Sequence, residues 1–198
     1  MKNGKEPKSK PYNSKKLASE SRKQLKNHPI LLPYYARTEE GKKDYDGSWN
    51  ELSFVPFGWK KLFLRMCAKM ERHLEMIGMK PTDTYFAEVK EKYGTLRVYL
   101  GGYVDDELEN TADAAEEESM LYCITCGKPT TMECGYYYLC DDCAKDFKGK
   151  KEPLTHKHIP YYTVFDENGK KEKKAYHYEK FQKQWASPSD GKDGEGSE

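Results

Sequence analysis

Two C-x-x-C cysteine pairs constrain this chain of 198 residues more than any other feature. Cys123 and Cys126 form the first pair, Cys140 and Cys143 form the second, and a stretch of hairpin length separates them. Two such pairs can place four thiolates around one ion in the tetrahedral geometry of structural zinc sites. The sequence therefore predicts that these four cysteines bind one structural Zn²⁺ ion.

Other roles for the four cysteines fit this spacing less well. The basic amino terminus lacks the apolar run of a secretory signal, so we expect a reducing compartment, where paired cysteines bind metal rather than form disulfides. Catalytic zinc usually keeps one open position beside three protein ligands, and iron–sulfur clusters usually have other spacings. The other two cysteines, Cys67 and Cys134, are interpreted as a buried core residue and a spare thiol.

The two cysteine pairs occupy different local contexts. Gly127 follows the first pair and permits a tight turn, whereas Cys140 ends a tyrosine-rich segment. Asp141 and Asp142 after it are typical of the first turn of a helix. A knuckle, a hairpin and a helix in this order favour a treble-clef-like site over a zinc ribbon.

Hydrophobic periodicity predicts the elements that precede the cysteines. Apolar residues recur at three- and four-residue spacing over 59–77, which predicts an amphipathic helix. Alternation over 85–89 and 96–100, with a turn at 92–95, predicts a β-hairpin whose apolar face this helix covers. An acidic segment capped near Asp105 predicts a second helix. The expected fold class is α+β, with flexible basic termini.

The same patterns divide the chain into five parts. A turn at Asn168-Gly169 predicts a second hairpin, with strands at 161–165 and 175–178. A short helix is expected after Ser14. The parts are a flexible basic arm (1–28), the α+β core (29–122), the zinc-binding knuckle (123–147), a basic linker with the second hairpin (148–184) and a disordered tail (185–198).

Three stretches together resemble a family of small phage- and prophage-encoded proteins whose function is not settled. They are Gly58-Trp59 at the start of the first helix, the string V-K-E-K-Y-G-T-L-R at 89–97, and the acidic segment 114–119 that runs into the two cysteine pairs. The resemblance covers roughly residues 58–147 and neither terminal arm. It implies an origin in a bacteriophage rather than an activity.

The charge distribution suggests partners, although the formal net charge is only +1. Lysines concentrate in the first 28 residues, where they could neutralise phosphates, and a basic row follows the predicted hairpin. Such a row is normally the solvated side of a hairpin. The tyrosines at 136–138 could stack on bases, but strand tyrosines more often pack on a core. The candidate nucleic-acid contacts are Lys15, Lys16, Arg22, Lys23, Lys90, Lys92 and Arg97.

The favoured interpretation is a non-enzymatic, zinc-stabilised protein that contacts nucleic acid or a phage or host protein. One alternative is a treble-clef (HNH-like) nuclease, but residues 127–139 contain no histidine or asparagine for such a site. The histidines closest after the cysteines are His156, His158 and His177. Another alternative is a modulator of a host enzyme that binds through an acidic helix face formed by Glu107, Asp113, Glu116 and Glu117.

The expected location follows from what the sequence lacks. No apolar run approaches the ~20 residues that a membrane helix needs, so we expect no membrane partner. The missing secretory signal indicates a cytoplasmic protein. For a phage-encoded chain this is the cytoplasm of the bacterial host, with association with the virion as a further expectation.

Overall fold

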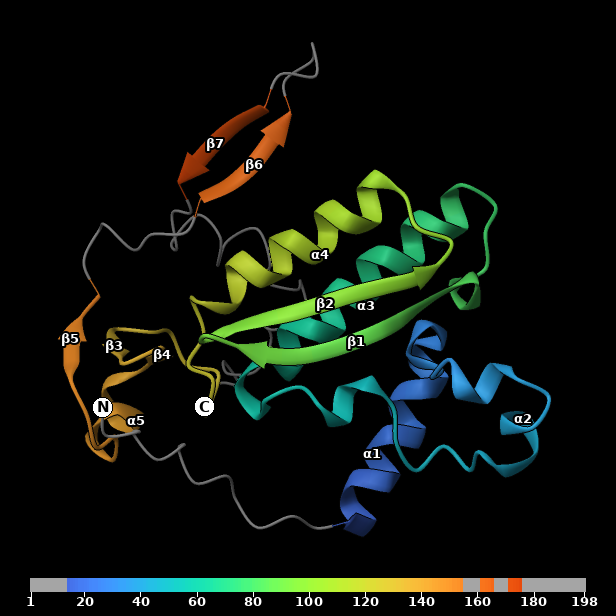
Figure 1. Ribbon diagram of the computed structural model, residues 1–198, viewed down its shortest axis with the longest axis horizontal. Helices are drawn as coiled ribbons and strands as arrows, with labels where there is room; N and C mark the ends of the chain where they lie inside the picture. Colours follow the sequence, from blue (N-terminus) through green and yellow to red (C-terminus); the bar gives the residue numbers. More distant parts are fainter. Residues whose placement is uncertain (1–13, 155–160, 166–170, 176–198) are drawn as a thin grey trace, which may run out of the picture. The chain divides into compact units, whose positions relative to one another are not determined.

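The computed structural model describes residues 14–154, 161–165 and 171–175 and has an α+β fold (Figure 1). Two compact units divide the chain, Met1–His158 and Ile159–Glu198. The first contains the core and all four cysteines of the two pairs. The described part of the second is an antiparallel hairpin of β6 (Tyr161–Phe165) and β7 (Lys171–Ala175).

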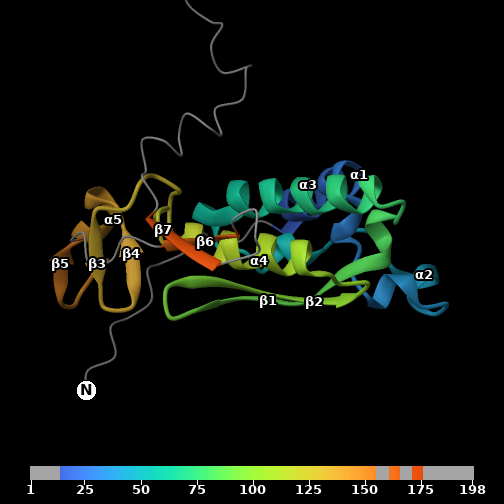
Figure 2. The same cartoon turned by 90° about the horizontal axis from the view of Figure 1, so that it is seen from above.

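Two helices and a hairpin form the core of the first unit. Helix α3 (Lys60–Met76) and helix α4 (Asp106–Ser119) lie on one side of the hairpin of β1 (Thr84–Lys92) and β2 (Thr95–Gly102) (Figure 2). Phe63 of α3 meets Phe86 of β1 with ring centroids 5.1 Å apart, which confirms that the first helix covers the hairpin. The Asp105 side chain caps α4 by accepting a hydrogen bond from the Leu108 amide at 3.0 Å.

The hairpin turns at Tyr93 and Gly94, the two residues between the paired Lys92 and Thr95. Both have positive φ, +52° and +77°. This is the pattern of a type I′ turn, whose twist matches that of the strands it joins. The turn therefore lies where the sequence predicts it, although asparagine or glycine is the usual residue at its first position.

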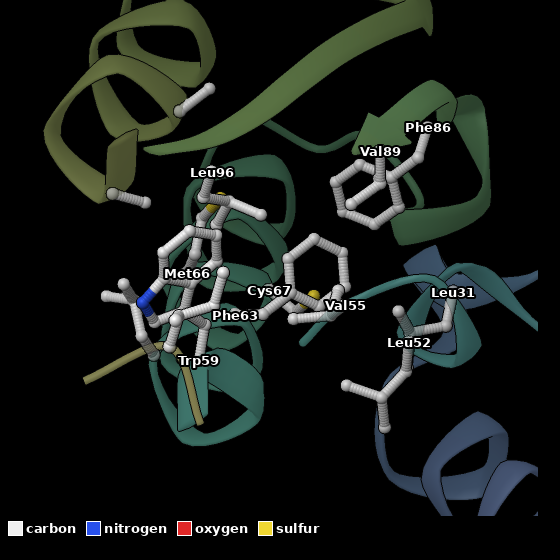
Figure 3. Packing of buried hydrophobic residues seen from close by; sticks show 14 of the residues in the cluster. Leu31, Leu52, Val55, Trp59, Phe63, Met66, Cys67, Phe86, Val89 and Leu96 are labelled. Atoms are coloured by element: carbon white, nitrogen blue, oxygen red, sulfur yellow. The ribbon is translucent and has the colours of Figure 1, made fainter. Parts of the chain in front are cut away.

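The hydrophobic core runs along α3 and receives side chains from every layer. Trp59, Phe63, Met70 and Leu74 from this stretch are completely buried. Figure 3 shows Trp59 and Phe63 among residues from the hairpin and from the irregular segment before α3. The contributors from these two regions include Leu31, Leu52, Val55, Phe86, Val89 and Leu96.

The short helix expected after Ser14 is present as α1 (Ser14–Asn27), but it packs on the core, whereas the sequence predicts a flexible arm over these residues. Ser21 is buried, and its hydroxyl oxygen accepts a hydrogen bond from the side chain of the completely buried Asn50 at 2.9 Å. Arg22 forms an ion pair with Asp46 at 2.9 Å. These tertiary contacts order a segment whose charge alone suggests an arm.

Short elements connect α1 to the core. They are single turns of 3-10 helix or α-helix, as expected for a segment rich in proline, glycine and aromatic residues without a clear period. Their bounds are η1 (Pro29–Leu31), η2 (Tyr35–Arg37), α2 (Gly41–Asp44), η3 (Glu51–Ser53) and η4 (Phe57–Trp59), with η5 (Pro81–Asp83) before β1.

The knuckle region contains more strand than the sequence suggests. Strands β3 (Met132–Cys134) and β4 (Tyr137–Leu139) form a hairpin, and helix α5 (Asp141–Lys145) follows. Strand β5 (Lys151–Pro153) pairs with β3 and extends the sheet in the order β4-β3-β5, inside the expected linker.

In the hairpin of the second unit, the described second strand is at 171–175, and residues 176–178 of the expected strand lie outside the described residues. Residues 1–13 and the expected tail 185–198 lie outside the described residues. None of the helices in the described ranges is long and apolar enough to cross a membrane.

Candidate metal centre

The side chains of Cys123, Cys126, Cys140 and Cys143 converge on one point. Their four Sγ atoms all lie within 4.8 Å of one another, and the Sγ atoms of Cys126 and Cys140 are 3.5 Å apart. A tetrahedral site with Zn–S bonds of about 2.3 Å places its sulfur atoms about 3.8 Å apart. The cluster therefore has the size of a site for one metal ion. Within the described residues, this is the group of three or more His, Cys, Asp or Glu side chains whose ligand atoms lie close enough together to hold a metal ion.

Two different local structures deliver the two pairs. The first pair lies on a tight turn, closed by hydrogen bonds from the Gly127 amide to the Cys123 carbonyl at 2.8 Å and from the Cys123 amide to the Lys128 carbonyl at 2.7 Å. Gly127 has a φ of +77°, which explains the glycine after this pair. In the second pair, Cys140 is the N-cap of α5 and Cys143 lies in its first turn. This sequence of knuckle, hairpin and helix has the treble-clef-like order.

The electrostatics of the thiols favour a cation at the centre. Burial raises the pKa of Cys126 and of Cys143, and neighbouring thiols raise the pKa of Cys143 further. Burial also acts on Cys140, but hydrogen bonds from the Cys143 amide and from adjacent thiols outweigh it and lower the pKa. Four thiolates in this space would repel one another unless a cation neutralised them. The donor set and its amide hydrogen bonds therefore fit a divalent ion that prefers sulfur.

The first cysteine turn is docked against the start of α3. The Gly58 amide donates to the Ile124 carbonyl at 3.0 Å, and Trp59 Nε1 donates to the Tyr122 carbonyl at 2.9 Å. A Cβ placed on Gly58 would lie 1.9 Å from the Cys123 carbonyl oxygen. Only glycine allows this approach of the two backbones. Gly58-Trp59 is part of the family resemblance, but the sequence carries no signal that predicts this contact.

The β3–β4 turn of the knuckle is docked against the turn of the β1–β2 hairpin. A Cβ on Gly94 would lie 1.8 Å from the Tyr136 carbonyl oxygen. The rings of Tyr93 and Tyr136 have centroids 5.8 Å apart. The cysteine region is therefore attached to the core at two separate places, one on α3 and one on the hairpin.

The two remaining cysteines lie outside the cluster. Cys67 is completely buried in α3, and burial raises the pKa of its thiol. Cys134 is completely buried in β3, and burial raises its pKa as well. Both positions agree with the interpretation of these residues as ordinary buried thiols.

The seven candidate nucleic-acid contacts lie on two elements. Lys15, Lys16 and Lys23 are exposed on α1, whereas Arg22 is ion-paired. On the hairpin, Lys90 and Arg97 are directly opposite each other. Lys90 pairs with Glu88 at 2.6 Å, and Arg97 forms an ion pair with Glu116. Lys92 is exposed, with its Nζ 5.7 Å from the centroid of the Tyr93 ring.

The predicted acidic face of α4 is partly engaged by the protein itself. Glu107 pairs with Lys69 at 3.0 Å, and Glu116 pairs with Arg97. Asp113 is exposed and Glu117 is half-buried. Glu118, which is not among the predicted residues, is buried in an ion pair with Arg65. Its burial raises the pKa of the carboxyl group to about 7, although Arg65 lowers it.

The chain matches no protein-family model, no curated protein and no solved structure. Its function is therefore inferred from its own residues.

Proposed function

We propose that this protein is a non-enzymatic binding protein whose knuckle is held by one structural Zn²⁺ ion. The observation that carries the proposal is the closed set of four thiols, docked on the core at Gly58 and at Gly94. Four cysteine ligands complete a tetrahedral shell and leave no position for water or substrate. The ion then stabilises the contact between knuckle and core rather than performing chemistry.

The described histidines support a non-enzymatic role. His28 Nδ1 lies 2.8 Å from a Glu71 carboxylate oxygen, and His73 Nε2 lies 2.7 Å from an Asp105 carboxylate oxygen. Both pairs join helix α3 to neighbouring segments, at residues other than those of the knuckle. His156, His158 and His177 lie outside the described residues. A treble-clef nuclease needs a histidine beside its metal, and the described knuckle supplies none.

Nucleic acid is the partner class that the described surface favours. Glu107 and Glu116 of the acidic helix already form ion pairs with Lys69 and Arg97 of this chain. This weakens the case for a modulator that docks through that face. Lys15, Lys23 and Lys92 are exposed and can meet phosphates. The phage origin implied by the family resemblance belongs to this proposal, with the partner then in the host bacterial cytoplasm; a phage or host protein is the second partner class.

Metal analysis tests the zinc assignment. We expect the purified protein to contain about one zinc per chain, and Cys126→Ser to lose most of it, because a missing thiolate opens the shell. Cys67→Ser makes the same change in a buried position outside the cluster and should retain the ion. A wild-type protein that folds without metal, or that carries an iron–sulfur chromophore, contradicts the proposal.

A further inference from the structure

Two exposed tyrosine rings lie together where the hairpin meets the knuckle. Tyr93 occupies the β1–β2 turn and Tyr136 the β3–β4 turn, and these turns are side by side in both views (Figures 1 and 2). Their centroids are 5.8 Å apart with the ring planes at 58°. Tyr93 is nevertheless 67% exposed and Tyr136 71% exposed, so the outer faces of both rings are open.

We propose that these two rings, together with Lys90 and Lys92, bind single-stranded nucleic acid by stacking on unpaired bases. We call this set of four residues the aromatic tip. The proposal rests on the binding function above and names its partner. Aromatic rings beside cationic side chains are the combination that binds single strands with little sequence preference.

The backbone at Tyr93 supports a role for its ring. Tyr93 is the one non-glycine residue with positive φ in the described part of the chain. Asparagine or glycine would occupy this turn position with less strain. Burial does not explain the tyrosine, because most of its side chain is exposed. Strained residues of this kind concentrate at functional sites.

Contact between the two turns holds the rings in place before any ligand binds. The close approach of Gly94 to the Tyr136 carbonyl leaves no room for a side chain between the turns. Tyr136 belongs to the segment between the two cysteine pairs, so its position depends on the knuckle and on the bound ion. Preorganised rings lose little conformational entropy on binding, which favours affinity.

Lys92 supplies the positive charge beside the rings, while the Glu91 carboxylate of the same hairpin is engaged by the Gly94 amide, from which its Oε1 accepts a hydrogen bond at 2.7 Å. Lys92 Nζ lies 5.7 Å from the Tyr93 ring centroid, and within the described residues no carboxylate pairs with it. Lys90 Nζ lies 5.3 Å from the ring of Tyr99 and pairs with the exposed Glu88. Lys151 is opposite Cys134 in the sheet, one residue before the β3–β4 turn. These ammonium groups can contact phosphates while bases stack on the rings.

Exposed rings on a turn favour unpaired bases over a duplex. In a duplex each base face is covered by its neighbours, so a protein ring can stack only where a base is free. The ammonium group of Lys92 beside the Tyr93 ring favours a polyanion over an apolar protein surface. A protein partner for the same residues is an outcome that the test distinguishes.

Fluorescence anisotropy with a labelled oligothymidylate of about 15 nucleotides tests the aromatic tip. We expect tighter binding to this strand than to the corresponding duplex. Tyr93→Ala and Tyr136→Ala should each raise Kd roughly tenfold, since each removes one stacking surface. Lys92→Gln should reduce the slope of log affinity against log salt concentration by about 1, the value expected for one lost phosphate contact. Tyr93→Phe, which keeps the ring, and Tyr35→Ala, which removes a 45% exposed ring elsewhere, should bind like wild type.

Tyr93→Asn separates binding from folding. Asparagine relieves the strained turn, so this variant should melt at the same or a higher temperature while losing affinity as Tyr93→Ala does. If Tyr93→Asn and Tyr136→Ala bind the oligonucleotide with wild-type affinity, the proposed role of the aromatic tip is wrong. The proposal of a zinc-stabilised binding protein would still stand. The aromatic tip is also overturned if the zinc-loaded protein binds no oligonucleotide or instead captures a protein in a tyrosine-dependent way. A metal-free folded protein contradicts the proposed function, whatever the oligonucleotide result.

Discussion

Residue 58 must be glycine because the backbone of the first cysteine turn occupies the space that a Cβ atom would need. Its amide donates to the Ile124 carbonyl, and the neighbouring Trp59 indole donates to the Tyr122 carbonyl. The two bonds position the knuckle at the start of the main core helix. A single methyl group at residue 58 therefore acts on the metal centre from outside it.

Gly58→Ala should destabilise the protein by about 1–3 kcal/mol or more, because the new Cβ would overlap a carbonyl oxygen that cannot move alone. Chemical denaturation, with zinc affinity measured in parallel, is the appropriate assay. Gly78→Ala is the control, since its φ of +78° brings strain of roughly 1 kcal/mol but a Cβ there has no neighbour within 4 Å. Equal losses in the two variants would argue against the backbone contact.

At this scale the sequence predicts ligands better than contacts. The four cysteines could be identified because C-x-x-C spacing is local and its geometry is nearly independent of the rest of the fold. The approach of Gly94 to Tyr136 joins segments that are distant in sequence, and neither residue carries a pattern that names its partner. The strained φ of Tyr93 is likewise visible only in the structure.

Helix α4 is joined by polar contacts to both α3 and the β1–β2 hairpin. The N-cap Asp105 pairs with His73 of α3. Two acidic residues of α4 also pair with α3, Glu107 with Lys69 and Glu118 with Arg65. Near its end, the Ser119 hydroxyl oxygen accepts a hydrogen bond from the Leu96 amide of β2 at 3.0 Å. Part of the acidic sequence of α4 is therefore explained by ion pairs within the protein.

Glu118 should make stability depend on pH. Its pKa of about 7 in the folded protein lies above the ordinary value of 4.5, so the folded state holds the proton more tightly than the unfolded chain. Its contribution is fully present below about pH 4.5 and is lost as pH rises through about 7. Relative to Glu118→Gln, the wild type should lose as much as about 3 kcal/mol across this range.

Urea denaturation of wild type and Glu118→Gln at several pH values measures this effect. The pH dependence of the metal site is common to both proteins, so it cancels in the difference between their unfolding free energies. A difference that does not vary with pH would show that Arg65 keeps Glu118 ionised throughout.

Elements with a hydrophobic period were predictable, and elements held by other forces were not. Helices α3 and α4 and the β1–β2 hairpin follow apolar patterns that sequence reveals directly. The sequence predicts helix α1 as a short helix after Ser14, but not its attachment to the core, because the contact includes the buried polar pair of Ser21 and Asn50. All three residues of β5 are exposed and pair with β3 through the backbone, so no side-chain alternation indicates a strand.

At the scale of the whole molecule, the knuckle is part of the core rather than an appendage. A sequence boundary at residue 122 separates the two, yet one compact unit extends through residue 158. The contacts at Gly58 and Gly94 attach the metal-binding segment to α3 and to the hairpin. If the proposed zinc ion is bound, it should stabilise the aromatic tip as well as the four cysteines.

Removal of the metal under native conditions tests the central claim most directly. With a strong chelator we expect release of about one equivalent of zinc, together with loss of amide hydrogen-exchange protection in residues 123–145 and at the 93–94 turn, while the middle of α3 stays protected. Added zinc should restore protection and oligonucleotide binding together. A metal-free protein with the same exchange pattern as the zinc-loaded one would contradict the account.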